Sequence, residues 1–518
     1  MNIRIIQSPI TIVTICNILS FIIQTSCMEP HSKNKHHDQI ASVQYNEGIS
    51  VGEKEFLHYR LPIVKKAIEE KFKHPITKEQ IPSVAIMGSG GGYRAMLYFT
   101  ALLASANKAH ILDTVTYISA LSGSTWALAP WITTGKPIAE FKTYIQQCAA
   151  KHFCDITHEE KKFIADKIIT KTLHNKRLTL VDIYGELLGN RLLESLGDSK
   201  YTAVLSDQIG RIEDGRYPYP IYIAIDGRNE KAAIENPTVY ACTPHTTSEH
   251  TNFTEIPSWA DDRKYKCDKS TNLTPEKNLA YDLGTWGSAF GASIHDILNN
   301  LFNDYPEILK IIEKMLKPID GDRIIPCYAV LPNYLYKTNH KTHDQTLRTD
   351  KTMIRVDAGL HCNLPFAPLS GICSERIADI LIVVDISAGE IGSELKKVVD
   401  YAKTHNLPFP TIDFTNINKR TISIFKDENN KTIPTVIYMP RISDPALWEI
   451  NKDNPEFKNY NLSGFDLDHE TNDGFAKTIH FHYTLENSTM LMNQASFNFH
   501  VNEDKIWEEI KWKVNQKS

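Results

Sequence analysis

Two apolar runs separated by a helical segment mark the early part of the chain. Residues 83–87 form the first run, which Pro82 and Gly88 bound. Residues 114–118 form a second run rich in β-branched side chains, and 95–112 between them has helical composition without proline or glycine. Short apolar runs bounded by turn residues are typical of buried strands, and longer uninterrupted segments are typical of helices. The pattern therefore predicts strand, helix and strand, as in an α/β fold.

A glycine-rich turn joins the first predicted strand to the predicted helix at 88–92. Glycines there let the backbone approach a ligand and direct N–H groups at negative charge, with help from the helix dipole. No Gly-Lys-Ser/Thr sequence follows, which excludes a P-loop. A dinucleotide site would need an acidic residue after a second strand about 20 residues on, where this chain is still helical. A plain tight turn and an oxyanion-binding loop both fit.

Ser122 lies at a second turn from strand to helix, after 114–118 and before the helical segment 125–129. Small neighbours suit a strained turn that exposes a nucleophilic hydroxyl. Here Ala120 and Ser124 occupy the places where the usual pattern has glycines. A serine that only caps the following helix is the alternative interpretation.

Asp357 ends a third apolar run, 353–356, just before a turn at Gly359. An aspartate in such a place is often only a turn former. A serine hydroxyl, however, becomes an effective nucleophile only when a base removes its proton. The glycine turn, Ser122 and Asp357 together supply the N–H donors, the nucleophile and the base that acyl transfer needs.

These segments resemble the catalytic domain of the cytosolic (group IV) phospholipase A2 family, which includes the fungal lysophospholipases called phospholipase B. The resemblance runs from about residue 51 to near the C-terminus. It implies a three-layer α/β fold with a mixed central sheet, of the patatin-like acylhydrolase type, with a cap or lid insertion. Further segments that match the family in its order are 178–185, 285–290, 363–366 and 407–410.

The resemblance implies catalytic roles for four residues. Ser122 matches the nucleophile, Asp357 matches the carboxylate that takes its proton, and Gly91 and Gly92 match the glycines of the oxyanion hole. The implied reaction is hydrolysis of acyl esters of phospholipids or lysophospholipids through an acyl-enzyme, without a cofactor. A broader esterase or acyltransferase is one alternative, and a catalytically silent lipid-binding surface protein is another.

Arg94 and Arg376 match two arginines that the family associates with the substrate phosphate. A guanidinium group forks readily onto phosphate oxygens. Arg376 stands two residues further from Asp357 than the family pattern leads us to expect. For Arg94 the alternative is an ion pair that ties the turn to the fold.

A Ser-His-Asp triad is the alternative to a dyad, and surface or structural roles are the favoured interpretation of the later histidines. No H-E-x-x-H or C-x-x-C spacing proposes a metal site. The net charge of −5 over 518 residues gives no support for nucleic-acid binding. The histidines considered are His405, His469, His480, His482 and His500.

The N-terminal residues 1–27 predict a signal peptide. Arg4 precedes an apolar stretch, 10–23, that is too short to span a bilayer. The interpretation is an exported protein, either secreted, periplasmic or at the cell surface. Ser26 and Cys27 also resemble the cleavage point of bacterial lipoproteins, which raises the possibility of a lipid anchor at Cys27.

The remaining organisation follows from polarity along the chain. Residues 28–45 are predicted as a polar leader and 46–518 as the catalytic domain, without room for the calcium-dependent lipid-binding domain of cytosolic members. Residues 243–282 are polar and predicted as a mobile lid, in which Trp259 responds to a phospholipid membrane or micelle surface. Possible disulfide pairs in an exported protein are Cys148/Cys154 and Cys242/Cys267.

Overall fold

The computed structural model describes residues 36, 38–45, 48–152, 154–173, 178–228, 238–249, 254–290, 328–340, 342, 345–372 and 375–517. Residues Asp38–Ser518 belong to one compact unit. The predicted signal segment 1–27, its Cys27 and half of the predicted leader 28–45 lie outside the described residues. Among the helices that are described, none is long and apolar enough to cross a membrane.

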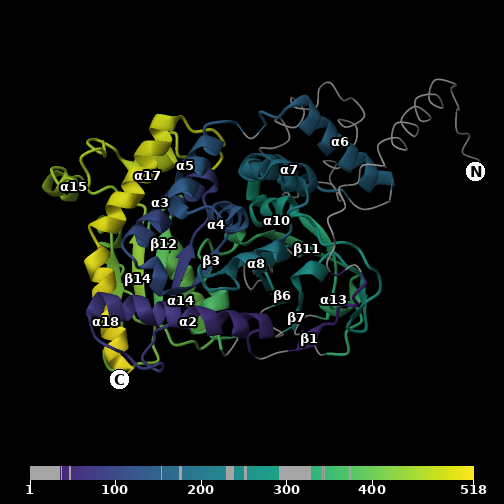
Figure 1. Ribbon diagram of the computed structural model, residues 1–518, viewed down its shortest axis with the longest axis horizontal. Coiled ribbons are helices and arrows are strands. Elements are labelled where there is room, and N and C mark those ends of the chain that lie inside the picture. Colours follow the sequence, from purple (N-terminus) through teal and green to yellow (C-terminus); the bar gives the residue numbers. More distant parts are fainter. Residues whose placement is uncertain are drawn as a thin grey trace, which may run out of the picture. The chain divides into compact units, whose positions relative to one another are not determined.

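A mixed sheet forms the centre of this unit (Figure 1). Its parallel part has the order β4-β3-β2-β12-β14. Every residue of these five strands is buried, as a parallel sheet between two helical layers requires. The strands are β2 (Val84–Gly88), β3 (Val115–Ala120), β4 (Tyr219–Asp226), β12 (Ile380–Asp385) and β14 (Thr435–Pro440).

Antiparallel strands extend the sheet at both ends. Beyond β4 lie β5 (Val239–Cys242), β6 (Thr246–Glu249), β7 (Thr254–Pro257) and β1 (Gln44–Tyr45), in that order. Beyond β14 lies β13 (Ser423–Phe425). The mixed central sheet predicted from the sequence is therefore present.

Helices cover both faces of the sheet. The chain passes from β2 through α3 (Gly92–Lys108) to β3, then through α4 (Gly123–Thr134) toward β4, and from β12 through α14 (Ser393–Thr404) toward β14. The first two connections advance across the sheet in one direction and the third in the other. Since parallel crossovers are right-handed, α3 and α4 cover one face and α14 the other. In the first layer α3 packs against α5 (Ile138–Ala149) and α17 (Leu485–His500), as Figure 1 shows.

The sequence located α3 correctly and missed its ends. The helix begins at Gly92 rather than at 95 and ends at Lys108 rather than at 112. It stops because His110 adopts a left-handed conformation, with φ of 57°, and a short 3-10 turn then leads into β3. The glycine turn is thus continuous with the first turn of α3.

Residues 243–282, predicted as a polar lid, are largely built into the structure. They contain β6 and β7 of the main sheet, the hairpin β8 (Tyr265–Lys266) and β9 (Lys269–Ser270), and the start of α10 (Leu279–Trp286). The sequence of β6 is polar throughout, and a strand without an apolar run is not predicted from the sequence pattern. Trp259 lies beneath the guanidinium of Arg263, which is 4.6 Å from the ring centroid.

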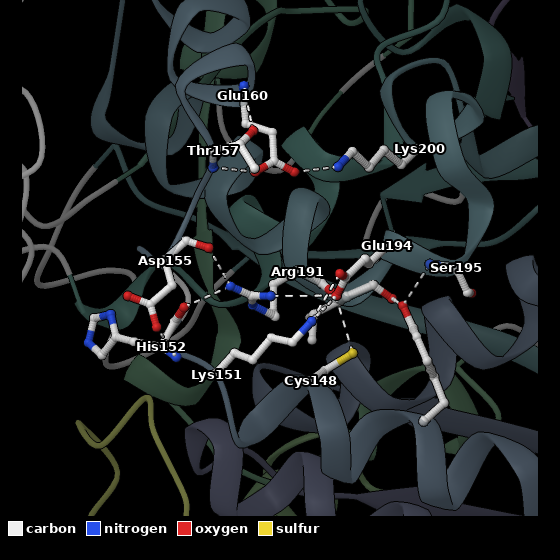
Figure 2. Close-up of polar contacts among 12 residues, drawn as sticks. Cys148, Lys151, His152, Asp155, Thr157, Glu160, Arg191, Glu194, Ser195 and Lys200 are labelled. Atoms are coloured by element: carbon white, nitrogen blue, oxygen red, sulfur yellow. Dashed lines mark hydrogen bonds and ion pairs between the residues drawn. The ribbon is translucent and has the colours of Figure 1, made fainter.

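A buried arginine holds the connection between α5 and α6 (His158–Leu173) against α7 (Leu180–Leu192), as Figure 2 shows. The Arg191 Nη2 atom donates to the carbonyl oxygens of His152 at 3.0 Å and Asp155 at 2.7 Å. The disulfides considered for an exported protein do not form in this region or elsewhere among the cysteines described. The free thiols are Cys148, Cys154, Cys242, Cys267 and Cys362.

Candidate active site

Two strands point toward each other along one edge of β4. β3 runs parallel to β4 and ends with Ala120 opposite Tyr222. β11 (Thr352–Asp357) runs antiparallel to β4 on the same edge and ends with Asp357 opposite Ala224, because β5 occupies the other edge. The two strand ends are therefore two β4 residues apart, a spacing of about 7 Å. Ser122 follows the end of β3, so this pairing brings Ser122 and Asp357 together.

Ser122 forms a strained turn between β3 and α4. Its φ is 47° and its ψ is −127°, a conformation that costs a non-glycine residue about 1–3 kcal/mol. The side chain makes no capping hydrogen bond to α4, which rejects the simple capping interpretation. A Cβ on the next residue, Gly123, would lie 2.1 Å from the carbonyl oxygen of Gly92. Glycine at 123 is therefore required for the serine turn to pack against the glycine turn.

Asp357 is fully buried beside this serine. Its Oδ1 accepts a hydrogen bond from the Gly359 N–H at 2.8 Å, and its own N–H donates to Ser288 Oγ at 3.0 Å. Its Oδ2 accepts no hydrogen bond of normal geometry from any residue in the described ranges. Burial raises the pKa of Asp357 to about 6, against the lowering effects of the Gly359 N–H, the nearby Ser122 hydroxyl and the Ala289 N–H. A carboxylate with a raised pKa is a stronger base.

The glycine turn is held in place by Asn363. Gly91 has a φ of 142°, which favours glycine, and it stands immediately before α3. The Asn363 Oδ1 atom accepts from the Gly90 N–H at 3.2 Å, while its Nδ2 donates to the Gly90 carbonyl at 3.3 Å and to Ser387 Oγ at 2.8 Å. Asn363 belongs to the segment 363–366 that matches the family, and its position six residues after Asp357 is the only sign in the sequence that it supports the site.

Arg94 lies beneath the glycine turn and is fully buried. Its Nε donates to the Ile386 carbonyl at 3.0 Å, and its Nη1 donates to the Ala476 carbonyl at 2.7 Å and to Thr478 Oγ1 at 3.1 Å. Nη2 has no partner within the described part of the chain and would lie 2.6 Å from a Cβ on Gly91. Burial lowers the pKa of Arg94 to about 10. This environment suits support of the glycine turn better than the predicted contact with a substrate phosphate.

Arg376 lies at the opposite end of the sheet, just before β12 begins. Its Nε donates to Glu53 Oε1 at 2.9 Å, and its Nη2 donates to Glu53 Oε2. Both side chains are buried, and Glu53 belongs to α2 (Val51–Phe72). The structure therefore places this pair at the amino ends of the strands, whereas Ser122 follows the carboxyl end of β3, and the role of Arg376 at the substrate phosphate stays a prediction. Spacing along the chain could not reveal at which end of the strands Arg376 would lie.

A small apolar cavity of about 40 Å³ adjoins the two catalytic candidates. Leu121 and Ala358, the neighbours of Ser122 and Asp357 in the chain, both line it. Such a lining suits a hydrocarbon group. Other lining residues are Ile223, Ile225, Phe366, Val398 and His361.

The later histidines considered for a triad do not line this cavity. His405 stacks on Tyr401 with 4.1 Å between ring centroids, and the Nδ1 atom of His500 lies 3.1 Å from Glu503. The histidine that does line the cavity is His361, which is not among the predicted triad candidates. No group of three or more His, Cys, Asp or Glu side chains in the described ranges could hold a metal ion. The remaining three candidates are exposed, namely His469, His480 and His482.

Comparison with solved structures identifies the fold. The human GIVD cytosolic phospholipase A2 superposes with a TM-score of 0.76 over 92% of this chain and 69% of that chain, at 17% sequence identity. The same protein in complex with methyl gamma-linolenyl fluorophosphonate gives a TM-score of 0.70, at 18% identity over 92% and 66% of the two chains. The predicted cytosolic-phospholipase-like α/β fold is therefore confirmed.

Sequence relatives agree with the structural neighbours. Cytosolic phospholipase A2 epsilon from Homo sapiens is 23% identical over 478 residues, which cover 80% of this chain and 54% of the relative. Cytosolic phospholipase A2 zeta from Homo sapiens is 24% identical over 76% of this chain and 53% of the relative. This chain thus spans about half the length of both. Cytosolic phospholipase A2 gamma from Homo sapiens is 24% identical over 89% of this chain and 95% of the relative.

These relatives contradict the export predicted from residues 1–27. Each of them is named a cytosolic enzyme, whereas the prediction assigned this chain to a secreted, periplasmic or surface location with a possible anchor at Cys27. A single basic residue before a short apolar run is a compositional signal that says nothing about the folded domain that follows. The exported localisation is therefore wrong.

The match to a family model covers the whole candidate site. The model of the lysophospholipase catalytic domain matches residues 84–399, which extend from β2 into α14. This range includes the glycine turn, Ser122 and Asp357. The resemblance seen in the sequence is confirmed, and this chain belongs to the family of the lysophospholipase catalytic domain.

Proposed function

We propose that this protein hydrolyses acyl esters of phospholipids or lysophospholipids, with Ser122 as nucleophile and Asp357 as general base. The observation that carries the proposal is the meeting of β3 and β11 on one edge of β4, which sets a strained serine beside a buried carboxylate. Membership of a lysophospholipase family supports the substrate class. A solved neighbour that binds a lipid-like fluorophosphonate is consistent with an acyl-transfer site in this fold.

The first half-reaction forms an acyl-enzyme. Asp357 takes the Ser122 hydroxyl proton as the Oγ atom attacks the ester carbonyl carbon. The amides of Gly91 and Gly92 hold the oxyanion, and loss of one such donor costs about 3 kcal/mol in the barrier. Asp357 then gives the proton to the departing alkoxide, which leaves as the alcohol.

The second half-reaction hydrolyses the acyl-enzyme. A water molecule attacks the acyl carbon while Asp357 removes its proton, and the same proton then returns to Ser122 Oγ as the fatty acid leaves. A pKa of about 6 suits both duties, because Asp357 is ionised at neutral pH yet basic enough to accept a proton. The Gly359 N–H at Oδ1 leaves Oδ2 for the serine.

The apolar cavity is the proposed acyl-chain site. Leu121 and Ala358 border it, so an acyl chain inside it would place the ester carbonyl next to Ser122 and Asp357. Buried apolar walls favour a hydrocarbon chain by about 25 cal/mol for each Å² removed from water. This feature favours lipid esters over small polar esters.

Product analysis tests the proposal. Wild-type protein is incubated with a phosphatidylcholine that carries different chains at its two positions, and separately with a lysophosphatidylcholine, with glycerol present. Mass spectrometry should find free fatty acid, and a fluorophosphonate probe should label Ser122. Absence of fatty acid from both lipids would overturn the hydrolase, acyl glycerol as the main product would indicate a transferase, and labelling at another residue would overturn the nucleophile.

A further inference from the structure

The proposed function leaves the phosphate of the head group without a partner. Arg376 is committed to Glu53 at the other end of the sheet, and Arg94 is buried beneath the glycine turn. The residues that line the acyl cavity include no lysine or arginine. A cation at the rim of that cavity would supply a head-group contact.

Lys397 of α14 stands at this rim. Its Nζ donates to the carbonyl oxygen of His361, a cavity-lining residue, at 3.0 Å. It also donates to Glu394 Oε1 at 2.9 Å. The side chain keeps 46% of its surface exposed, so the third ammonium proton is available to an anion from solvent.

The charge of Lys397 is only partly balanced by Glu394. The other carboxylate oxygen of Glu394 accepts the Asn363 N–H at 2.6 Å, so Glu394 also serves the loop after Asp357. The ammonium is thus held at a fixed place by two protein acceptors rather than moving freely. A fixed cation loses little entropy when it binds a phosphate oxygen.

The geometry of α14 directs Lys397 to the cavity and Lys396 away from it. Val398 and Tyr401 of this helix line the cavity. Each residue turns about 100° around a helix, which puts Lys397 beside that face and Lys396 on the opposite side. Both lysines are exposed, and next to His361 the exposed Leu360 adds apolar surface.

We propose that Lys397 binds the phosphodiester of the substrate head group while the acyl chain fills the cavity. The inference rests on the proposed function and names the residue that selects for phosphate-bearing esters. Lys397 is a binding residue and takes no part in proton transfer. It should favour phospholipids over esters of similar chain length without phosphate.

The test compares two soluble esters, dihexanoylphosphatidylcholine below its micelle threshold and dihexanoylglycerol. The measured quantity is the ratio of kcat/KM for the phospholipid to kcat/KM for the phosphate-free ester. We expect Lys397→Gln to lower this ratio about tenfold, mainly through a higher KM for the phospholipid, as loss of one charge-assisted hydrogen bond predicts. Lys397→Arg should restore most of the ratio, and the matched control Lys396→Gln should leave it within twofold.

Each other outcome has a defined meaning. An unchanged ratio in Lys397→Gln, or equal losses on both esters, would overturn the phosphate contact, the latter because Lys397 would then act through Glu394 and Asn363. A wild type that shows no preference for the phospholipid would overturn the role of Lys397 and leave the esterase mechanism standing. A folded wild type that cleaves neither ester would overturn the proposed function and this inference with it.

Discussion

The two ends of the central sheet differ in how completely the hydrogen bonds of certain buried charged side chains are satisfied. At the amino ends of the parallel strands, all three guanidinium nitrogens of Arg60 donate to backbone carbonyls, at 2.7–2.9 Å. Arg376 forms a two-pronged pair with Glu53 nearby. At the carboxyl ends, Asp357 Oδ2 and Arg94 Nη2 lack partners within the described residues, and Ser122 holds a strained backbone.

Within one sheet, the amino ends of the strands therefore contribute mainly to stability, and the carboxyl ends carry the proposed active site. The hydrogen bonds of Arg60 and Arg376 join α2 to the starts of the strands. Breaking these bonds is costly, because it would leave a buried charge unpaired. Unsatisfied groups and strain persist only where surrounding packing enforces them, and they are concentrated at functional sites. Substitutions at the carboxyl ends should therefore change activity, and those at the amino ends should change stability.

The largest expected effect is at Ser122. Ser122→Ala removes the nucleophile, so kcat should fall at least about 10⁴-fold. The free energy of unfolding should change by less than about 1 kcal/mol, because a single hydroxyl that makes no cap is lost. Turnover of a monomeric ester and chemical denaturation measure the two quantities. Retained turnover in the folded variant would remove Ser122 from the mechanism.

Asp357→Asn should also abolish turnover, by about 10⁴-fold, since an amide cannot accept the serine proton. It should at the same time stabilise the fold above pH 6. The folded pKa of about 6 exceeds the unfolded value of about 3.9. Ionisation of Asp357 therefore lowers the stability of the native state above pH 6 by up to about 3 kcal/mol. Below pH 4 the group is protonated in both states, and this destabilisation is absent.

The same pKa predicts the wild-type pH dependence. Below pH 6 the base is protonated, so kcat/KM should fall about tenfold per pH unit. Denaturation curves of wild type and Asp357→Asn at pH 4 and pH 8, with a pH–rate profile of wild type, check both statements. If Asp357→Asn gains no stability at pH 8, then the ionised Asp357 does not destabilise the folded state.

Arg376→Met tests the other end of the sheet. It leaves Glu53 buried without its cation, so the free energy of unfolding should fall by about 3–5 kcal/mol. The folded variant should keep kcat within about threefold of wild type, because Arg376 lies at the strand starts. Adding Glu53→Gln should recover part of the stability. A loss of kcat comparable with that of Ser122→Ala would place Arg376 in the site after all.

Histidine substitutions should have the smallest effects. In a dyad, His361→Gln should lower kcat less than about tenfold through altered cavity packing, whereas loss of a triad histidine would cost about 10⁴-fold. Replacement of His405 or His500, which contact Tyr401 and Glu503, should change kcat less than about twofold. Steady-state kinetics on a monomeric ester distinguishes the two mechanisms, and one indispensable histidine would overturn the dyad.

Local features of this protein were determined by the sequence itself. Glycines after 83–87, the small residues around Ser122 and the apolar run before Asp357 each specify a strand end and a turn through residues within a few positions of one another. Steric and hydrogen-bonding preferences of this kind act over short stretches of chain. These local features can therefore be predicted from the sequence.

Long-range relations were decided only by the tertiary structure. The meeting of Ser122 with Asp357 depends on two distant strands sharing one edge of β4, and the separation of Arg376 from them depends on which strand end its loop reaches. The polar strand β6 is fixed by its neighbours in the sheet rather than by its own side chains. Pairing across hundreds of residues is selected by burial and backbone hydrogen bonding of the whole domain, and no local pattern encodes it.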